Sequence, residues 1–449
     1  MTRLAIDGGD KAVPKLGPYT SKIHKEELEE LLDLWEFAPG VKEKMVALIE
    51  KSADQLKGPH LFRYYNPRPS KVDEAEQAFA KYIGVQHVLA VNSCTSALIA
   101  SLRALGVGMG DEVIVPAYTF FASAAVIAAS NAIPVIADVD ATLTLDPKDV
   151  ARRITPRTRA IIVVHMRGMP AQMDELMAIA NQHKIPVIED VAQAAGGMYK
   201  GRMLGSIGTM GCFSFDYYKI LNSGEGGFIT TNDPWLHTRA QSWHDCAACW
   251  RPNRFASEQR EGELFCGENY RMSELQGAVA VAQIRKARKY LKGYRAAKKA
   301  IVKKLVLPDG VRLQPVSDPA GDASICLILF LPDVDMTRRA LAAMQAEGVP
   351  AGGIYDHKVK DWHIYVHWEH ILDHKSVSWD GLPWSGAPEG KLPKYTKEMC
   401  PQSTELLSRA IMIDINWEYS AAECGAIAKG INKVLAACCA KAPDTKLGG

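Results

Sequence analysis

Short β-branched runs alternate with helix-like segments between residues 75 and 232, and this rhythm constrains the fold more than any other feature. The runs are almost continuously apolar, which is typical of strands buried on both faces of a sheet. Helix-like segments separate the first five runs, as in parallel strands joined by crossover helices. The last two runs follow each other without a helix, so we expect them to be oriented differently. The runs are His87–Val91, Glu112–Val115, Pro134–Ala137, Ala160–Val164, Pro186–Glu189, Cys212–Phe215 and Phe228–Thr231.

These segments predict an α/β domain on a large, mostly parallel seven-stranded sheet, with helices over both faces. Ser273 and Gln276 have the spacing of a capping box and predict the start of a long helix. The helices predicted between the strands are Thr95–Leu105, Phe121–Asn131, Pro147–Ile154 and Met173–His183.

The pattern changes at about residue 290, where shorter strand and helix candidates follow one another. We expect a large domain over residues 1–290 with an N-terminal arm over 1–60, and a smaller α+β domain over 291–449. Residues 352–403 form a long segment rich in Trp, Pro, Gly and His within the second domain. Loops of that length are usually functional or disordered, and the tryptophans argue against disorder.

Composition excludes several classes of protein. The 449 residues are 47% hydrophobic, which is enough apolar side chain to build a core and argues against a disordered chain. Lys and Arg outnumber Asp and Glu by only two, so no net charge attracts nucleic acid. No apolar run reaches membrane-spanning length, and the charged start lacks the core of a signal peptide. We therefore expect a cytoplasmic protein whose ten cysteines are mostly thiols.

Ser93-Cys94-Thr95-Ser96 stands between an apolar strand and an apolar helix candidate. Backbone N–H groups and hydroxyls at the start of a helix suit an anion, most often phosphate. Plain N-capping is the simpler interpretation, and the segment alone favours it.

Two acids, Glu189 and Asp190, close a strand of buried type. They would lie at the carboxyl edge of the sheet, where open α/β sheets bind ligands. An acid there needs a cation or a helix cap to offset its desolvation, so capping is the alternative to a functional role.

Lys219 follows a strand and stands among aromatic and glycine residues. A lysine amine in such surroundings is a candidate for Schiff-base chemistry, whereas an ordinary loop lysine is solvated. Gly224, Gly226 and Gly227 indicate special dihedrals or a close approach of the backbone.

Together these three segments supply a phosphate site, an acid and an amine, which is the set that holds pyridoxal phosphate (PLP). Their order resembles that of fold type I PLP enzymes. The residues within the individual motifs are more specific still. They are similar to the motifs of the DegT/DnrJ/EryC1/StrS family of sugar and cyclitol aminotransferases. The segments that carry this resemblance are VNSCTSAL, DEVIVPAYTF, IPVIEDVAQAAG, GCFSFDYYK, GEGGFITT and NYRMSELQGAVAVAQ.

The resemblance implies roles for individual residues. Lys219 would bind PLP as a Schiff base and then act as general base and acid. Asp190 would pair with the pyridine nitrogen and keep it protonated. Gln193 would lie beside the 3-oxygen of the ring, and Phe120 would stack on its face.

The resemblance also implies a phosphate cup formed by Cys94, Thr95, Ser96 and Ser214. Asn269 would reach the phosphate of a neighbouring subunit, which implies a homodimer with shared active sites. The family usually has glycine where Cys94 stands, so the cup is altered here.

Two substrates are implied for a ping-pong aminotransferase of this family. Glutamate or glutamine would donate the amino group, and a keto or aldehyde carbon of a sugar, sugar acid or cyclitol would accept it. The LAIDGG start resembles the cyclitol branch, whereas HMRGMPAQMD and WHIYVHWEHIL resemble the branch that aminates an oxidised eight-carbon ulosonate. The second resemblance is the longer, and it favours a carbohydrate carbonyl of that kind as the acceptor. No arginine can be assigned to the donor carboxylate.

Two other classes of function stay open. One is a PLP-dependent sugar dehydratase or other lyase, although family dehydratases carry His in place of the lysine. The other is a non-catalytic or metal-binding relative.

Two clusters invite a metal interpretation, but we expect no metal. Cys246 and Cys249 follow His244, yet a fourth zinc ligand is not evident. His363 begins a series of four histidines, and no pattern of carboxylates or cysteines completes a metal site with them. We instead expect His244 and His363 to contact substrate, with a surface position as the alternative for the histidines.

A run of ten Lys or Arg without an acid lies between Arg285 and Lys304. A solvated helix face is the default interpretation, and attraction of an anionic substrate is the sharper one.

Overall fold

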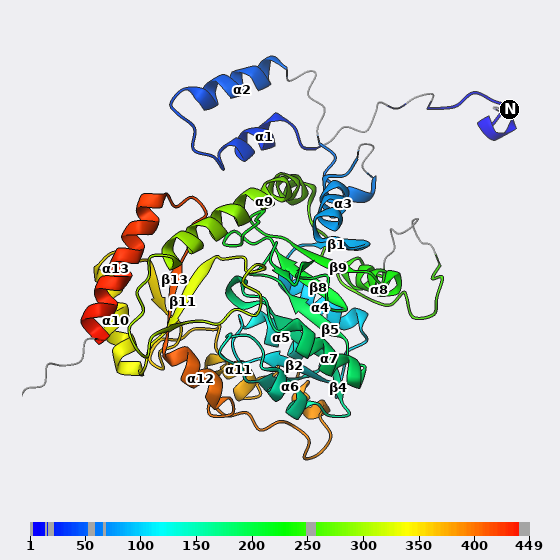
Figure 1. The fold of residues 1–449 in the computed structure, drawn as a ribbon. Coiled ribbons are helices and arrows are strands. Elements are labelled where there is room, and N and C mark those ends of the chain that lie inside the picture. Colours follow the sequence, from blue (N-terminus) through cyan, green and yellow to red (C-terminus); the bar gives the residue numbers. More distant parts are fainter. Residues whose placement is uncertain are drawn as a thin grey trace, which may run out of the picture. The chain divides into compact units, whose positions relative to one another are not determined.

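The computed structural model describes residues 3–13, 16, 22–52, 59–65, 69–247 and 257–439. The chain falls into two compact units, residues 1–70 and 71–449 (Figure 1). The described residues of the first unit include short helical segments, and none of the residues in α1 and α2 is buried. The segments are η1 (Ala5–Asp7), α1 (Lys25–Leu32), α2 (Val41–Lys51) and η3 (Arg63–Tyr65).

A seven-stranded sheet forms the centre of the second unit and confirms the sheet predicted from the sequence. Its strand order is β1-β9-β8-β5-β4-β2-β3. Strand β9 runs antiparallel to both β1 and β8, whereas the other neighbours pair in parallel. Of the last two predicted runs, only β9 is oriented differently from the rest of the sheet, because β8 pairs in parallel with β5. The strands are β1 (His87–Val91), β2 (Glu112–Pro116), β3 (Ile133–Ala137), β4 (Thr158–Val164), β5 (Val187–Asp190), β8 (Met210–Ser214) and β9 (Gly227–Thr231).

Helices cover both faces of this sheet, because alternate residues of its strands point to opposite sides. Leu89 packs in a core with α4 (Cys94–Ala104), α5 (Ala122–Ala129) and α8 (Pro234–His244). Its neighbour Val88 packs in a second core on the other side. The helices of that second core are α3 (Lys71–Ile83), α6 (Pro147–Arg153), α7 (Met173–His183) and α9 (Glu274–Val302).

The helix starts follow the predicted local signals. Ser273 caps α9 and completes a capping box with Gln276. Asp146 caps α6, which has Pro147 in its first turn. A small hairpin, β6 (Met198–Tyr199) and β7 (Arg202–Met203), and the 3-10 turn η4 (Met166–Gly168) complete this part.

A second, antiparallel sheet with the order β10-β11-β13-β12 lies toward the C-terminus, where Figure 1 shows it beside α10 and α13 in yellow and red. Helix α9 runs through residue 290 without a break. The division of the chain at residues 290 and 291 remains a prediction. The elements are β10 (Arg312–Leu313), β11 (Cys326–Phe330), α10 (Val334–Ala346), β12 (Ala351–Gly353), α12 (Pro401–Ser408), β13 (Ala410–Asp414) and α13 (Ala421–Cys439).

The segment over residues 352–403 is ordered around buried aromatic side chains. Trp368 and Tyr365 are fully buried, and the Trp368 indole donates to the carbonyl of Trp362. A β-bridge joins Ile364 to Tyr118, which follows β2, so this segment is fixed against the large sheet. Its short helices are η5 (Tyr365–His367), α11 (Glu369–Leu372) and η6 (Trp384–Gly386).

Across the described ranges of the chain, we find no helix of the length and apolarity that a membrane crossing requires.

Candidate active site

A cavity of about 690 Å³ opens at the carboxyl ends of the central strands, where Val164 ends β4, Asp190 ends β5 and Ser214 ends β8. Ligands of open α/β sheets bind at this edge. The cavity brings together most of the site residues predicted from the sequence: Cys94, Thr95, Phe120, Asp190, Gln193, Ser214, Lys219 and His363.

Asp190 is a buried carboxylate without a cation partner among the described residues. Its Oδ2 accepts from the Ser123 hydroxyl at 2.8 Å, and its Oδ1 accepts from the Ala192 N–H at 3.0 Å. Burial raises the pKa of Asp190, although these hydrogen bonds and the charge of Lys219 oppose the shift. A positively charged or N–H group of a ligand would relieve this desolvation.

Lys219 lies in the loop between β8 and β9, and both ends of this loop are fixed. The N–H of Phe215 donates to the Gly226 carbonyl, and the N–H of Ser223 donates to the Phe215 carbonyl. The Lys219 side chain faces the cavity, and its ammonium has no ion-pair partner in the part of the chain that the structure describes. Its amine is therefore available to a ligand.

The start of α4 forms one wall of the cavity. Ser93 caps the helix, and its Oγ accepts from the Ser96 N–H at 3.1 Å. Cys94 and Thr95 line the cavity at the first turn, where unpaired N–H groups favour an anion. Ser96 does not line it, because its hydroxyl donates to Asn92 Oδ1. The cap thus leaves the first turn of α4 open to the cavity, with Ser96 on the capping side.

Gly227 brings Ser214 close to the start of α4. It pairs with Val91 of β1 on one side and with Ser214 of β8 on the other. A Cβ at this position would lie 2.6 Å from the Ser93 backbone, so only glycine fits. The neighbouring Gly226 has φ +151°. Both observations agree with the close approach and special dihedrals expected of these glycines.

Phe120, Gln193 and His363 lie along the rest of the cavity wall. The rings of Phe120 and His363 are 5.3 Å apart between centroids. His363 Nδ1 is 2.7 Å from Asp361 Oδ1, and hydrogen bonds from His363 hold the pKa of Asp361 below its ordinary value against the effect of burial. Gln193 Oε1 accepts from the Arg167 N–H at 3.1 Å.

His244 and Asn269 do not line this cavity. His244 is completely buried at the end of α8, with Nδ1 3.0 Å from the Gln241 carbonyl, so the geometry does not support its predicted contact with substrate. Asn269 is exposed, and its backbone pairs with that of Asp245. Its role toward a neighbouring subunit remains a prediction.

The described ranges hold no group of three or more His, Cys, Asp or Glu side chains placed to bind a metal ion. Cys246 is described and exposed, whereas Cys249 lies outside the described residues. His370 and His374 pack against aromatic rings, His370 on Trp362 and His374 on Trp384. This packing accounts for the positions of these two histidines without a metal.

The basic stretch that begins at Arg285 lies along α9 and beyond its end, and only Tyr294 of this helix lines the cavity. Several of its cations have local partners: Arg285 contacts Glu74, Lys298 contacts Asp322, and Lys289 lies over the Trp417 ring. The contacts favour the solvated helix face over direct contact with a substrate.

Arg167 is among the cavity residues that were not predicted. It lies in η4, directly after β4. The only signal for it in the sequence is an arginine between the end of a buried strand and a glycine, in HMRGMP. The position of Arg167 at the carboxyl end of a strand could have identified it as a candidate.

Comparison with known proteins agrees with this geometry. Residues 66–373 match the profile of the DegT/DnrJ/EryC1/StrS aminotransferase family. The chain belongs to this family. It is 38% identical over 290 residues, 63% of the chain, to an L-glutamine:2-deoxy-scyllo-inosose aminotransferase of Micromonospora echinospora. It is 41% identical over 224 residues to the GDP-perosamine synthase of Caulobacter vibrioides, across 49% of this chain and 57% of that protein.

The match to the Micromonospora family member spans 64% of that protein's length, just under two thirds. The match to the solved structure of 3-amino-5-hydroxybenzoic acid synthase is more extensive, with 90% of this chain and 97% of that chain covered. Its TM-score is 0.69 at 26% identity. The fold is therefore that of fold type I PLP-transferases, as predicted.

The Cys94 thiol, where the family usually has glycine, is expected to be unreactive. Its Sγ lies 4.0 Å from Asp190 Oδ1, and burial and the charge of Asp190 raise the pKa of Cys94 well above its ordinary value. Because the thiolate is the nucleophile, iodoacetamide near neutral pH should label exposed Cys246 and Cys266 and leave Cys94 unmodified. Mass spectrometry of the digested protein measures this, and labelling of Cys94 ahead of Cys266 would contradict it.

Proposed function

We propose that this chain is a PLP-dependent aminotransferase that moves an amino group from glutamine or glutamate to a carbonyl carbon of a sugar, sugar acid or cyclitol. The observation that carries the proposal is a single cavity lined by the uncompensated carboxylate of Asp190, the amine of Lys219 and the start of α4.

The chemistry of these residues fits PLP. Buried Asp190 lacks a cation, and a protonated pyridine nitrogen would provide one. The first turn of α4 with Thr95 and the nearby Ser214 would hold the phosphate. Lys219 would bind the aldehyde. Phe120 would cover the ring face and Gln193 would lie at the ring edge.

When bound, PLP supplies an electron sink for the carbanion formed at the substrate carbon. Asp190 would keep the ring nitrogen protonated, which this sink requires. The Lys219 amine would take the proton from the substrate carbon and return it, as general base and then acid. Lys219 also favours transamination over dehydration, since it stands where dehydratases of the family carry His.

Similar proteins named for glutamine-dependent amination of an inosose and for perosamine synthesis support a polyol-like acceptor. We also infer a homodimer with shared sites and a cytoplasmic location. Exposed Asn269, which lies outside its own subunit's cavity, would reach the phosphate of the partner.

The visible absorption spectrum of the purified protein tests the proposal. Protein loaded with PLP should be yellow, and glutamine or glutamate alone should remove the visible band as the cofactor takes up the amino group. A band that persists with both donors would favour a lyase. A protein that takes up no PLP would contradict the proposal as a whole.

A further inference from the structure

Arg167 is the one arginine that lines the described cavity, and the preceding proposal does not use its charge. Its guanidinium has no carboxylate partner within ion-pair distance among the described residues. Asp361 and Asp414 face it from neighbouring segments and interact with it only at longer range. An unpaired guanidinium in a protein cavity is a strong site for an anion.

The guanidinium is held by a buried hydroxyl. Arg167 Nε donates to the Tyr118 hydroxyl at 3.3 Å, and Tyr118 is 1% exposed. Among the described residues, neither Nη atom of Arg167 donates a hydrogen bond to an acceptor, and both remain accessible to solvent. They are therefore free to form the paired hydrogen bonds that a carboxylate accepts.

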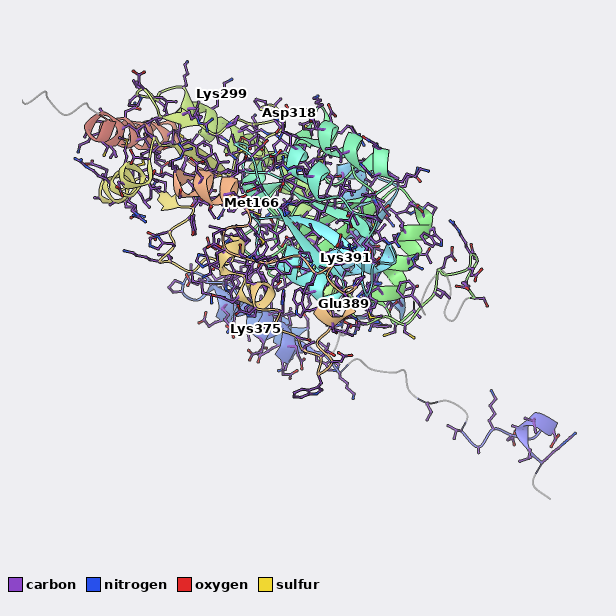
Figure 2. The ribbon with its side chains drawn as sticks, turned by 90° about the horizontal axis from the view of Figure 1, so that it is seen from below. Met166, Lys299, Asp318, Lys375, Glu389 and Lys391 are labelled. Atoms are coloured by element: carbon purple, nitrogen blue, oxygen red, sulfur yellow. The ribbon has the colours of Figure 1, made fainter. Side chains whose placement is uncertain are left out.

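The backbone of Arg167 is also fixed in an unusual conformation. Its φ is +55°, in the left-handed region that non-glycine residues rarely adopt. Its N–H donates to Gln193 Oε1, and its carbonyl accepts from the Cys326 thiol at 3.6 Å. The adjacent Met166, labelled in Figure 2, is buried. Strained residues that the surrounding structure holds in place are typical of ligand sites.

We infer that Arg167 is the residue that binds the α-carboxylate of the amino donor. This inference rests on the proposed function. Arg167 reaches the cavity from the side of Gln193, whereas the start of α4 with Thr95 provides the separate phosphate position. Both amino donors carry an α-carboxylate, so one fixed guanidinium serves either. Tyr118 is a positioning residue, since it acts through Arg167.

The test follows the reaction of the PLP-loaded enzyme with the donor alone, by stopped-flow absorbance. Loss of a hydrogen-bonded charge pair removes about 1.5–3 kcal/mol, so Arg167→Gln should raise the half-saturating glutamine concentration roughly 10- to 100-fold. Arg167→Lys should give an intermediate value, and Tyr118→Phe a smaller increase. Arg159→Gln, at an exposed arginine that pairs with Asp111, is the matched control and should change nothing.

An amine without the α-carboxylate separates binding from a general structural effect. With 4-aminobutanamide in place of glutamine, wild-type enzyme and Arg167→Gln should react equally slowly. Equal losses with both amines would overturn the inference, and so would an unchanged glutamine dependence in Arg167→Gln. If Arg167→Gln does not fold, the same comparison in Tyr118→Phe decides.

A second arm tests whether the carboxylate belongs to the acceptor instead. Enzyme already converted to the amine form is mixed with an uncharged keto sugar or with a sugar acid that carries an aldehyde. An effect of Arg167→Gln on the sugar acid alone, with normal donor kinetics, would overturn the assignment to the donor. Failure of the wild-type enzyme to react with either donor would instead refute the proposed function. That outcome is distinguishable from the results that would overturn the role of Arg167, because each of those requires a wild-type enzyme that reacts.

Discussion

Lys219→Ala should lower the transamination rate by at least roughly 100- to 10,000-fold, the range attributed to a positioned general acid–base group. Its amine is the only lysine amine among those lining the described cavity, so no neighbour can replace it. The variant should also fail to hold the cofactor covalently. Borohydride reduction should fix PLP on the peptide that contains Lys219 in the wild type only, as mass spectrometry would show.

The control for this prediction is Lys200→Ala, at an exposed lysine that pairs with Asp174 and does not line the cavity. It should retain wild-type rates and the covalent cofactor. A substantial rate in Lys219→Ala, or a borohydride-fixed cofactor on another lysine, would show that the catalytic amine is misassigned.

Asp190→Asn should reduce the rate by at least about 100-fold, because a neutral amide cannot keep the ring nitrogen protonated. The size and shape of the side chain are preserved, and an amide oxygen can still accept from the Ala192 N–H. We therefore expect PLP to bind with altered absorption. Rates and spectra of the loaded variant, with exposed Asp373→Asn as control, measure both effects.

The same substitution should stabilise the cofactor-free protein at neutral pH. Burial raises the pKa of Asp190 above its ordinary 3.8, so the ionised form costs folding free energy. Below the ordinary pKa, Asp190 is protonated in both the folded and the unfolded state, and folding carries no such cost. The cost grows as the pH rises from the ordinary pKa to the raised pKa of the folded state, and it is constant above the raised pKa. The Tm advantage of Asp190→Asn should thus be present at pH 7 and vanish in acid. An unchanged difference at all pH values would rule out this cause.

The central sheet could be predicted from the sequence because its strands are buried on both faces and read as apolar runs. Met173–His183 matches α7 at both ends, since polar residues bound it. Strand β9 illustrates the limit. The composition of β9 indicates a strand, and its position directly after β8 indicates a different orientation. Its pairing with β1, however, depends on contacts between residues distant in sequence.

The site was predictable where a residue type is unusual for its place, as with Asp190 at a strand end and Lys219 among aromatics. Ser96 and His244 differ from these residues, since neither lines the cavity. Ser96 follows a cavity residue in sequence, but its hydroxyl donates to Asn92. His244 precedes a cysteine pair, but its ring lies against the carbonyl of Gln241. Arg167 was missed because its place after a strand was its only signal in the sequence, and its lack of an ion-pair partner among the described residues shows only in the structure.

Strand β9 holds two ends of the site at once. Its first residue, Gly227, allows Ser214 to lie close to the start of α4, and the loop that it closes carries Lys219. An insertion or deletion in this strand would therefore shift the phosphate end and the amine end together. His363 and Arg167 belong to other segments. If the proposed function holds, enzyme engineers could change residues in those segments to alter the substrate side without changing the strand that would keep the two cofactor contacts at a fixed spacing.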